Sequence, residues 1–435
     1  MNKQKWIDRA LQLGLDELEI YQTLSTEKEF TWFEKTMDTF VTSKVLSTNI
    51  RAIKDGNIAS IAIENVDDEK MDEVLKALLE QTEIVQSEEN TRLTEKHEIV
   101  PVEKTHHFDF LSVEEVEELL GLIEQKALAY DERIAQVAYL GFEQGEGSRQ
   151  ITNSLGVDLK DEDAVQYVAC SVAAMQDGEF KDATKIKVVF DKDGFDADEF
   201  VKEVCDEALF KLGARSIPSR TCPVIFEKDA MTSLFAAFAG MFSGESIARG
   251  ISPLTKEIGK KVFSGQITVV DDPRSVEALS NAAFDDEGFP TSRKVIVDHG
   301  VFEQPLHSAK SAAKMNTVST GNGFGSGVSP MNMWIVPGER SLEQMMADMK
   351  DGLVITDVTG LHAGLRFTST QFSLQAGGYW VRDGKKSEPV TLITVAGRFL
   401  DLMNDVQEIG NDLDWSYKQI VCPSIWFRQC AVSGE

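Results

Sequence analysis

Three turn signals between alternating apolar and polar residues constrain most strongly how this chain can fold. Asp55-Gly56, Asp298-His299-Gly300 and Asp383-Gly384 each separate two such runs. Asp-Gly pairs favour the left-handed backbone of a tight turn, and such a turn joins neighbouring antiparallel strands. We therefore predict β-hairpins in both halves of the chain.

Helix signals lie between these hairpins. A capping pattern, in which Ser or Asp is followed three residues later by Glu or Gln, predicts helices that begin after Ser112, Asp196 and Ser341. Apolar spacing predicts further helices near residues 6–11, from residue 67, over 229–242 and over 398–409. Gly213 and Gly410 are expected to end two of the helices.

Length and apolar content indicate a folded chain with a sizeable core. The 435 residues, 42% of them hydrophobic, suggest two domains with a boundary near Pro218. The predicted fold class is α+β. It comprises an N-terminal α/β domain of helices and hairpins (residues 1–217) and a β-rich C-terminal domain with a few helices (residues 218–435).

The charge of the chain limits its partners. Lys and Arg total 44 against 72 for Asp and Glu, a net charge of −28, so a phosphate backbone would be repelled and we expect no nucleic-acid partner. The longest apolar stretches are shorter than the ~20 residues of a membrane-spanning helix, so no membrane partner is expected. The charged N-terminal segment lacks the apolar core of a signal peptide, and we expect a cytoplasmic protein.

No short motif predicts a metal site in this chain. The five cysteines form no C-x-x-C pair and are expected to be reduced thiols: Cys170, Cys205, Cys222, Cys422 and Cys430. The six histidines include no two that lie one helical turn apart with a glutamate between them: His97, His106, His107, His299, His307 and His362. We therefore expect no metal bound by this chain alone.

Glycine-rich and acidic segments are expected to be structural. Residues 320–330 lack the Gly-Lys-Ser/Thr ending of a phosphate-binding loop, and their glycines favour a broad turn or the close approach of an extended peptide. Asp271-Asp272 and Asp285-Asp286-Glu287 adjoin Pro or Gly turns, where carboxylates commonly accept backbone hydrogen bonds. No G-x-S-x-G elbow supplies a nucleophile.

The second half carries several family signatures in a fixed order. They are SPLTKEIGKKVFSGQITVVDDP, FDDEGFPTSRKVIVDHGVFEQPLHS, KMNTVSTGNG, GLVITDVTGLHAG, FSLQAGGYWVRDGKKSEPV, TLITVAGRFLDLMNDVQEIGNDL and AVSG. Together they resemble the TldD/TldE (PmbA) family, also called the modulator of DNA gyrase family. The resemblance extends from about Pro223 to Glu435 and is weaker over the first half.

This resemblance implies a metal-free, TldE-like subunit. TldD-type members resemble one another in an H-E-x-x-x-H helix, whose zinc site a later cysteine completes, whereas TldE-type members lack the helix signature. The corresponding segment here, MTSLFAAFAGMFSGES (residues 231–246), contains no histidine. Cys422 falls near the position of the relatives' cysteine ligand, but without histidines we expect a packed thiol. No catalytic residue and no cofactor is then expected in this chain, and zinc is expected in a TldD-like partner.

One departure from the family marks candidate binding residues. The family usually shows a TGdFS-like phrase, where this chain has TSTQFS at residues 368–373. The candidates for a peptide cleft or an interface are Thr370, Phe372, Ser373, Gly377 and Gly378.

The function that the resemblance implies is a non-catalytic role in a heteromeric metallopeptidase. The TldD-like chain would cleave unfolded peptides, in peptide maturation or in degradation of small labile proteins, and this chain would shape the chamber. One alternative is a homodimeric module that binds peptides or another ligand without protease activity. The other is an autonomous hydrolase whose metal site combines Cys422 with His299, His307 or His362.

Overall fold

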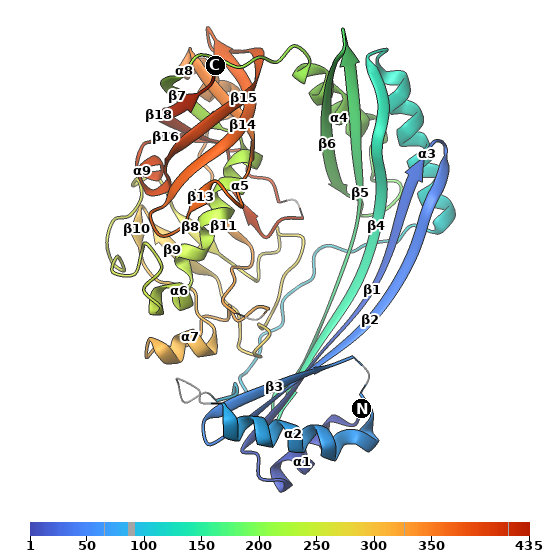
Figure 1. The fold of residues 1–435 in the computed structure, drawn as a ribbon, viewed down its shortest axis with the longest axis vertical. Coiled ribbons are helices and arrows are strands. Elements are labelled where there is room, and N and C mark those ends of the chain that lie inside the picture. The colour runs from blue at the N-terminus through green and yellow to red at the C-terminus, as the bar shows by residue number, and fades with distance from the viewer. Residues whose placement is uncertain (65, 86–91, 326, 416) are drawn as a thin grey trace.

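A computed structural model describes residues 1–64, 66–85, 92–325, 327–415 and 417–435. The first half forms a long curved sheet with helices, and the second half forms a compact body beside it (Figure 1). The chain crosses from one part to the other at the top of Figure 1, between the last helix of the first half and the first strand of the second.

Six antiparallel strands form the first sheet, in the order β3-β2-β1-β4-β5-β6. They are β1 (Glu17–Phe33), β2 (Thr36–Lys54), β3 (Asn57–Ile63), β4 (Ile134–Asn153), β5 (Asp158–Gln176) and β6 (Glu179–Val188). Asp55 and Gly56 have φ angles of 50° and 78°, which confirms the predicted hairpin between β2 and β3. Four strands, β1, β2, β4 and β5, are 17 to 20 residues long. This length allows the same sheet to pack against a separate hydrophobic core at each of its two ends.

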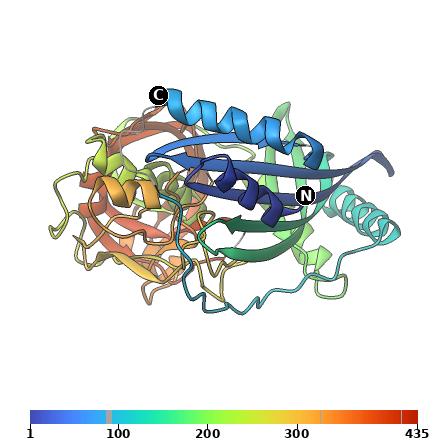
Figure 2. The same cartoon turned by 90° about the horizontal axis from the view of Figure 1, so that it is seen from below.

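Both cores of the first sheet lie on the same face. At the lower end α1 (Lys3–Gln12) and α2 (Met71–Ile84) cover Leu18 and Ile20, and Figure 2 shows these two helices across the strands. At the upper end α3 (Val113–Tyr130) and α4 (Ala197–Lys211) cover Phe30. Because Leu18, Ile20 and Phe30 are even numbers of positions apart in β1, their side chains share one face of the sheet.

The predicted helix starts are confirmed. Ser112 and Ser341 each accept a hydrogen bond from the third helical residue, whose side chain accepts one in return. Asp196 accepts a hydrogen bond from the backbone of Glu199 at the start of α4. Gly213 has a φ of 77°, so it supplies the expected left-handed residue just beyond α4.

A seven-stranded sheet in the second half closes on itself. Its strands are β7 (Arg220–Phe226), β12 (Gly352–Thr359), β13 (Leu365–Arg366), β14 (Gln371–Arg382), β15 (Lys385–Arg398), β16 (Val406–Ile409) and β18 (Ile425–Ser433). Five of them pair in the cyclic order β7-β18-β15-β14-β12, because β12 pairs with both β14 and β7. We call this ring the barrel.

A second, five-stranded sheet and several helices complete this part. The sheet order is β10-β9-β8-β11-β17, from β8 (Val269–Asp271), β9 (Lys294–Asp298), β10 (Val301–Phe302), β11 (Met333–Ile335) and β17 (Ile420–Val421). The helices are α5 (Lys228–Phe238), α6 (Gly244–Ala248), α7 (Ala309–Lys314), α8 (Leu342–Met349) and α9 (Phe399–Asn404). A short 3₁₀ turn spans Ala239–Phe242 after α5, and another, Asp68–Lys70, precedes α2 in the first half. Leu234, Phe235 and Phe238 of α5 lie in the largest core, which also contains apolar residues of the barrel. The predicted hairpins at residues 298–300 and 383–384 are confirmed.

The predicted helix over residues 398–409 is wrong in its second part. α9 ends at Asn404, and Val406–Ile409 form strand β16. The backbone of β16 pairs with β18, and the Asp405 carboxylate accepts a hydrogen bond from the backbone N–H of Gln429 at 2.9 Å. Val406 and Ile409 are three positions apart, a spacing that fits a helix and also a strand with a bulge. Pairing with β18 stabilises the strand.

The predicted α+β class is confirmed, and the strand pairs of the first sheet are all antiparallel. Strand β6 ends at Val188 and β7 begins at Arg220, while the domain division at residues 217 and 218 stays a prediction. Within the residues that the structure describes, no helix is both long and apolar enough to cross a bilayer.

Candidate functional site

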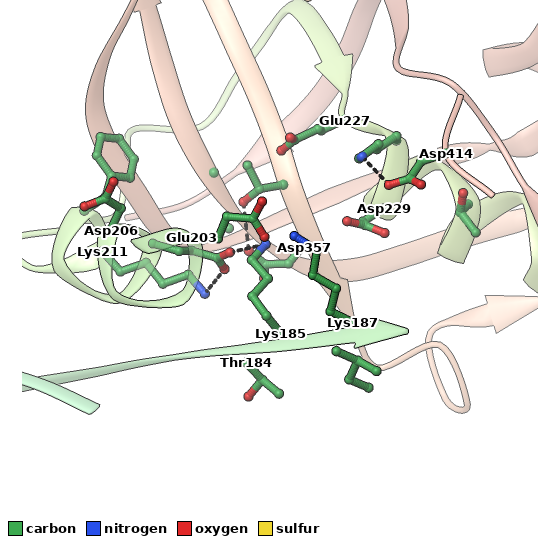
Figure 3. A pocket seen from close by; sticks show the side chains of 18 of the residues that line it. Thr184, Lys185, Lys187, Glu203, Asp206, Lys211, Glu227, Asp229, Asp357 and Asp414 are labelled. Carbon is green, nitrogen blue, oxygen red and sulfur yellow. Dashed lines mark hydrogen bonds and ion pairs between the residues drawn. The ribbon is translucent and has the colours of Figure 1, made fainter. Parts of the chain in front are cut away.

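A cleft of about 1360 Å³ lies where the first sheet faces the barrel (Figure 3). Strand β6 and helix α4 form one wall, and the start of α5 with parts of β12, β14 and β15 forms the other. The charged residues that line it are Lys181, Asp182, Lys185, Lys187, Glu203, Asp206, Glu207, Lys211, Glu227, Lys228, Asp229, Asp357, Lys386, Asp414 and Lys418. It is therefore a polar cleft with acidic and basic groups on both walls.

On the wall of β6 and α4, the lysines are neutralised by neighbouring carboxylates. Lys185 and Lys211 share Glu207, with N–O distances of 2.6 Å and 2.7 Å. Burial disfavours ionisation of Glu207, but the two lysines lower its pKa. Lys187 pairs with Glu199 at 3.5 Å. These side chains form ion pairs within the wall and leave little net charge there.

On the opposite wall, the carboxylates of Glu227 and Asp357 form no ion pair within the described residues, although Asp357 accepts a hydrogen bond from Thr356 Oγ1 at 3.1 Å. Lys228 pairs with Asp414 at 2.6 Å and Lys418 with Asp229 at 2.8 Å. Glu227 lies between β7 and α5, and its carboxylate makes no ion pair or hydrogen bond within the described part of the chain. Burial, and then the charge of Asp229, raises the pKa of Glu227.

Two aromatic rings, one from each wall of the cleft, hold a lysine. The Lys386 ammonium lies 3.8 Å from the ring centroid of Phe210 and 4.7 Å from that of Tyr379. The two rings pack edge to face, with centroids 5.9 Å apart. Burial lowers the pKa of Lys386, and no carboxylate among the described residues forms an ion pair with it. Cation–π attraction to the ring faces offsets part of the cost of burying its charge.

Two of the predicted site residues, Gly377 and Gly378, line the cleft. A Cβ atom on Gly378 would lie 1.9 Å from the carbonyl oxygen of Val354 in β12, and a Cβ on Gly377 would lie 2.6 Å from Oδ2 of Asp357. The two glycines therefore let β12 approach β14 closely, and Gly377 leaves room for the Asp357 carboxylate at the cleft surface.

The other three predicted site residues lie outside the lining of the cleft. Thr370 is fully buried with a φ of 55°, and its carbonyl accepts a hydrogen bond from Phe399 at 2.7 Å. Phe372 belongs to the largest core. The Ser373 N–H donates to the carbonyl of Gly364 at 2.8 Å. The structure gives these residues packing contacts at the start of β14, and their role in an interface stays a prediction.

The donor set does not fit a zinc ion. Cys422 lines the cleft, but its thiol is buried, which raises its pKa, and its backbone N–H donates to Thr232 Oγ1 at 2.9 Å. His307 is buried against Ser311, whereas His299 and His362 lie on exposed turns. Across the ranges that the structure describes, no three His, Cys, Asp or Glu side chains are grouped so that they could hold a metal ion.

The acidic turn at residues 285–287 is held by backbone groups, as predicted. Asp285 accepts from the N–H of Gly323 at 2.8 Å, and Asp286 accepts from that of Gly325 at 2.7 Å. Glu287 accepts from the first residue of α7 at 2.7 Å. Two residues of the glycine-rich segment 320–330, Gly323 and Gly325, thus donate their N–H groups to carboxylates of the same chain; residue 326 of this segment lies outside the described residues.

Arg149 of β4 connects the first sheet to this acidic turn. Its guanidinium donates to Asp286 at 2.6 Å and to the carbonyl of Phe284 at 2.7 Å, and it pairs with Asp161 at 3.2 Å. The phenol of Tyr21 donates to the same Asp286 at 2.8 Å. We call this group the Arg149 junction; it ties the two parts of the molecule together.

Sequence reasoning did not identify Glu227, Lys386 or Phe210. Glu and Lys are common on protein surfaces and Phe is common in cores. The isolation of Glu227 and the stacking of Lys386 on Phe210 depend on contacts between distant elements. One signal was available for Glu227, because it directly follows the apolar strand end Val224–Phe226 and precedes a helix. Polar residues at strand ends often line binding sites.

Comparisons with known proteins agree on one family. Residues 219–434 match the PmbA/TldA metallopeptidase C-terminal domain, and residues 106–214 match the PmbA/TldA metallopeptidase central domain. The chain is 28% identical over 327 residues to Metalloprotease PmbA of Escherichia coli O157:H7, covering 75% of this chain and 71% of that protein.

Solved structures share the whole fold. A Thermotoga maritima protein described as a modulator of a DNA gyrase superposes with a TM-score of 0.91 and 28% identity, over 99% of each chain. TldE from Thermococcus kodakarensis superposes with a TM-score of 0.89 over 99% of this chain and 100% of that one. At 22% identity, this second likeness concerns the fold alone.

Proposed function

Because the chain belongs to the PmbA/TldD metallopeptidase family, we propose that it is a zinc-less subunit of a heteromeric peptidase that acts on unfolded peptides. In this assembly a TldD-like subunit holds the zinc ion and cleaves the substrate. The present chain contributes a wall of the substrate chamber. The proposal places the complex in the cytoplasm, where free cysteines such as the five of this chain stay reduced.

The observation that carries this proposal is the side-chain set at the floor of the cleft. The start of α5 borders the cleft with Lys228, Asp229 and Thr232, and the segment 231–246 has no histidine. The nearby Cys422 is a buried thiol with a raised pKa. A catalytic zinc site usually has three protein ligands and an open position for water. Cys422 and Thr232, with no histidine in the segment 231–246, do not supply such a set of ligands.

The cleft suits an extended peptide. Strand β6 is an edge of the first sheet, and its residues 184–188 line the cleft. An edge strand has main-chain N–H and C=O groups that can pair with an added strand, and such pairing depends little on the side chains of the ligand. This chain would therefore hold many unfolded sequences, while a folded protein would be too large to enter.

Metal analysis and peptide cleavage test the proposal together. The purified chain should contain no stoichiometric zinc and should not cleave an unfolded peptide. A mixture with a TldD-like protein should cleave it faster than that protein alone and should elute as a heteromer in size-exclusion chromatography.

Two other outcomes would contradict the proposal. A stable homodimer that binds peptide and ignores the TldD-like protein would support a binding module instead. Stoichiometric zinc and activity in the lone chain, both lost in Cys422→Ser, would support an autonomous hydrolase.

A further inference from the structure

The unpaired carboxylate of Glu227 lines the cleft among other charged groups. Three lysines lie within range of its charge: Lys185 and Lys228 already form ion pairs with other carboxylates at 2.6 Å, and Lys386 is held on aromatic ring faces. Asp229 and Glu207 add further negative charge around it. Glu227 therefore lines the cleft without a direct ion pair to any described residue, because two of the nearby lysines are paired elsewhere and the third is held by aromatic rings.

The neighbouring aromatic corner gives independent support. Phe210 and Tyr379 already bind one ammonium group, that of Lys386, on their ring faces. Glu227 is the carboxylate that most strongly raises the pKa of Lys386, yet the two side chains do not form an ion pair. This region thus favours cations through a carboxylate and through aromatic faces, and Lys386 does not satisfy the carboxylate.

We propose that Glu227 forms a subsite for a positively charged group of the bound peptide, supplied by a lysine or arginine side chain or by the free α-amino group. This inference rests on the proposed function, because it assumes that the cleft binds peptide. A charge-assisted hydrogen bond from the ligand would supply the missing counter-ion. The raised pKa of Glu227 agrees with this, since burial without a counter-ion disfavours its charged form.

Lys386 sets the strength of this subsite. Its ammonium lies close enough to feel the charge of Glu227, so it repels a second cation bound there. Removing the Glu227 charge should weaken binding of a cationic peptide, whereas removing the Lys386 charge should strengthen it. A merely structural role for either residue would not produce changes of opposite sign.

Binding of fluorescent unfolded peptides to this chain alone tests the inference. One peptide carries a single lysine and a free N-terminus, and its variants replace lysine by norleucine, acetylate the N-terminus, or do both. Fluorescence anisotropy at pH 7.5 and low salt should show tighter binding of a cationic peptide than of the doubly neutral one. The two singly modified peptides identify which cation occupies the subsite.

Charge variants of the protein complete the test. In Glu227→Gln the affinity for the preferred cationic peptide should fall about five- to tenfold, the range expected for one partly buried charge pair. The affinity for the neutral peptide should not change. Lys386→Met should raise affinity for the cationic peptide, and Glu117→Gln, at an exposed position of α3, is the matched control.

Equal binding of cationic and neutral peptides by the unmodified protein would overturn the subsite and leave the proposed function intact. An equal loss for both peptides in Glu227→Gln would also overturn it. Absence of binding by any peptide would refute both this inference and the role of the cleft. As a further check, the preference for cations should disappear as the pH falls through the raised pKa of Glu227.

Discussion

Replacing Arg149 by methionine should weaken the contact between the two parts of the molecule and lower the free energy of unfolding. The Arg149 side chain is 16% exposed and contacts Asp286, Asp161 and the carbonyl of Phe284. Its guanidinium also lies 4.7 Å from the ring centroid of Phe284. Methionine keeps most of the apolar stem and removes the charge and its hydrogen bonds, so the variant tests the electrostatic part of the junction.

The expected loss follows from what remains around Asp286. That carboxylate is 18% exposed and keeps hydrogen bonds from Tyr21 and Gly325. Removing one partner of a fully buried ion pair costs about 3–5 kcal/mol. Partial exposure and the two remaining donors reduce the expected loss in the free energy of unfolding to about 2–3 kcal/mol.

Urea denaturation followed by tryptophan fluorescence measures this loss. The matched control is Arg215→Met, because Arg215 is 73% exposed and pairs with Glu179 on the surface, where solvent screens the charges. Arg149→Met should lower the unfolding midpoint clearly, and Arg215→Met should leave it nearly unchanged. Equal midpoints for the two variants would refute the assignment of a stabilising role to the Arg149 junction.

Three further predictions concern packing, pH and thiols. Gly378→Ala should destabilise the protein several times as much as Gly377→Ala in the same denaturation assay. The new Cβ at position 378 would meet the rigid backbone carbonyl of Val354, whereas the one at position 377 would meet the movable side chain of Asp357. Similar losses of stability in the two variants would contradict this prediction. Burial and then Glu287 raise the pKa of Asp285 from 3.8 to about 7, so its contribution to stability is complete below pH 3.8 and is lost as the pH rises through 7. The free energy of unfolding should therefore fall more between pH 4 and 7 in the unmodified protein than in Asp285→Asn, and parallel curves would exclude the shift. Burial raises the pKa of all five thiols, so Ellman's reagent at pH 8 should label the native chain slowly. The half-buried Cys222 should react first. Rapid labelling of several thiols in the native chain would be inconsistent with the structure.

Features set by local chemistry were predictable from sequence. The turn at Asp55-Gly56 needs two left-handed residues, and an Asp-Gly pair adopts that backbone at little cost. Ser112 and Glu115 satisfy backbone groups within one turn of helix, so their pattern marks the start of α3 wherever that helix packs. Asp285 accepts backbone hydrogen bonds from Glu287 and Phe289 for a similarly local reason, the tight turn that follows it. The backbone donors to Asp286 and Glu287 come from distant segments.

Features set by distant contacts were not predictable in the same way. Residues 406–409 have apolar spacing that suits a helix, and they form a strand because β18 lies beside them. The isolation of Glu227 depends on Lys185 being paired with Glu207 and Lys228 with Asp414, and these four residues come from four different segments. Gly377 and Gly378 were named through family resemblance, and only the packing of β12 on β14 explains their small size.

The closed ring of strands in the barrel can form only after its last strand, β18, has been translated. Strand β7 pairs with β12 and β18, and its Cys222 lies opposite Cys430, which is translated about two hundred residues later. While the ribosome makes the intervening segments, β7 has neither neighbour, although the first sheet is already complete. The nascent chain must therefore shield an apolar strand with unpaired edges, and a chaperone that binds such strands would raise the yield of folded protein.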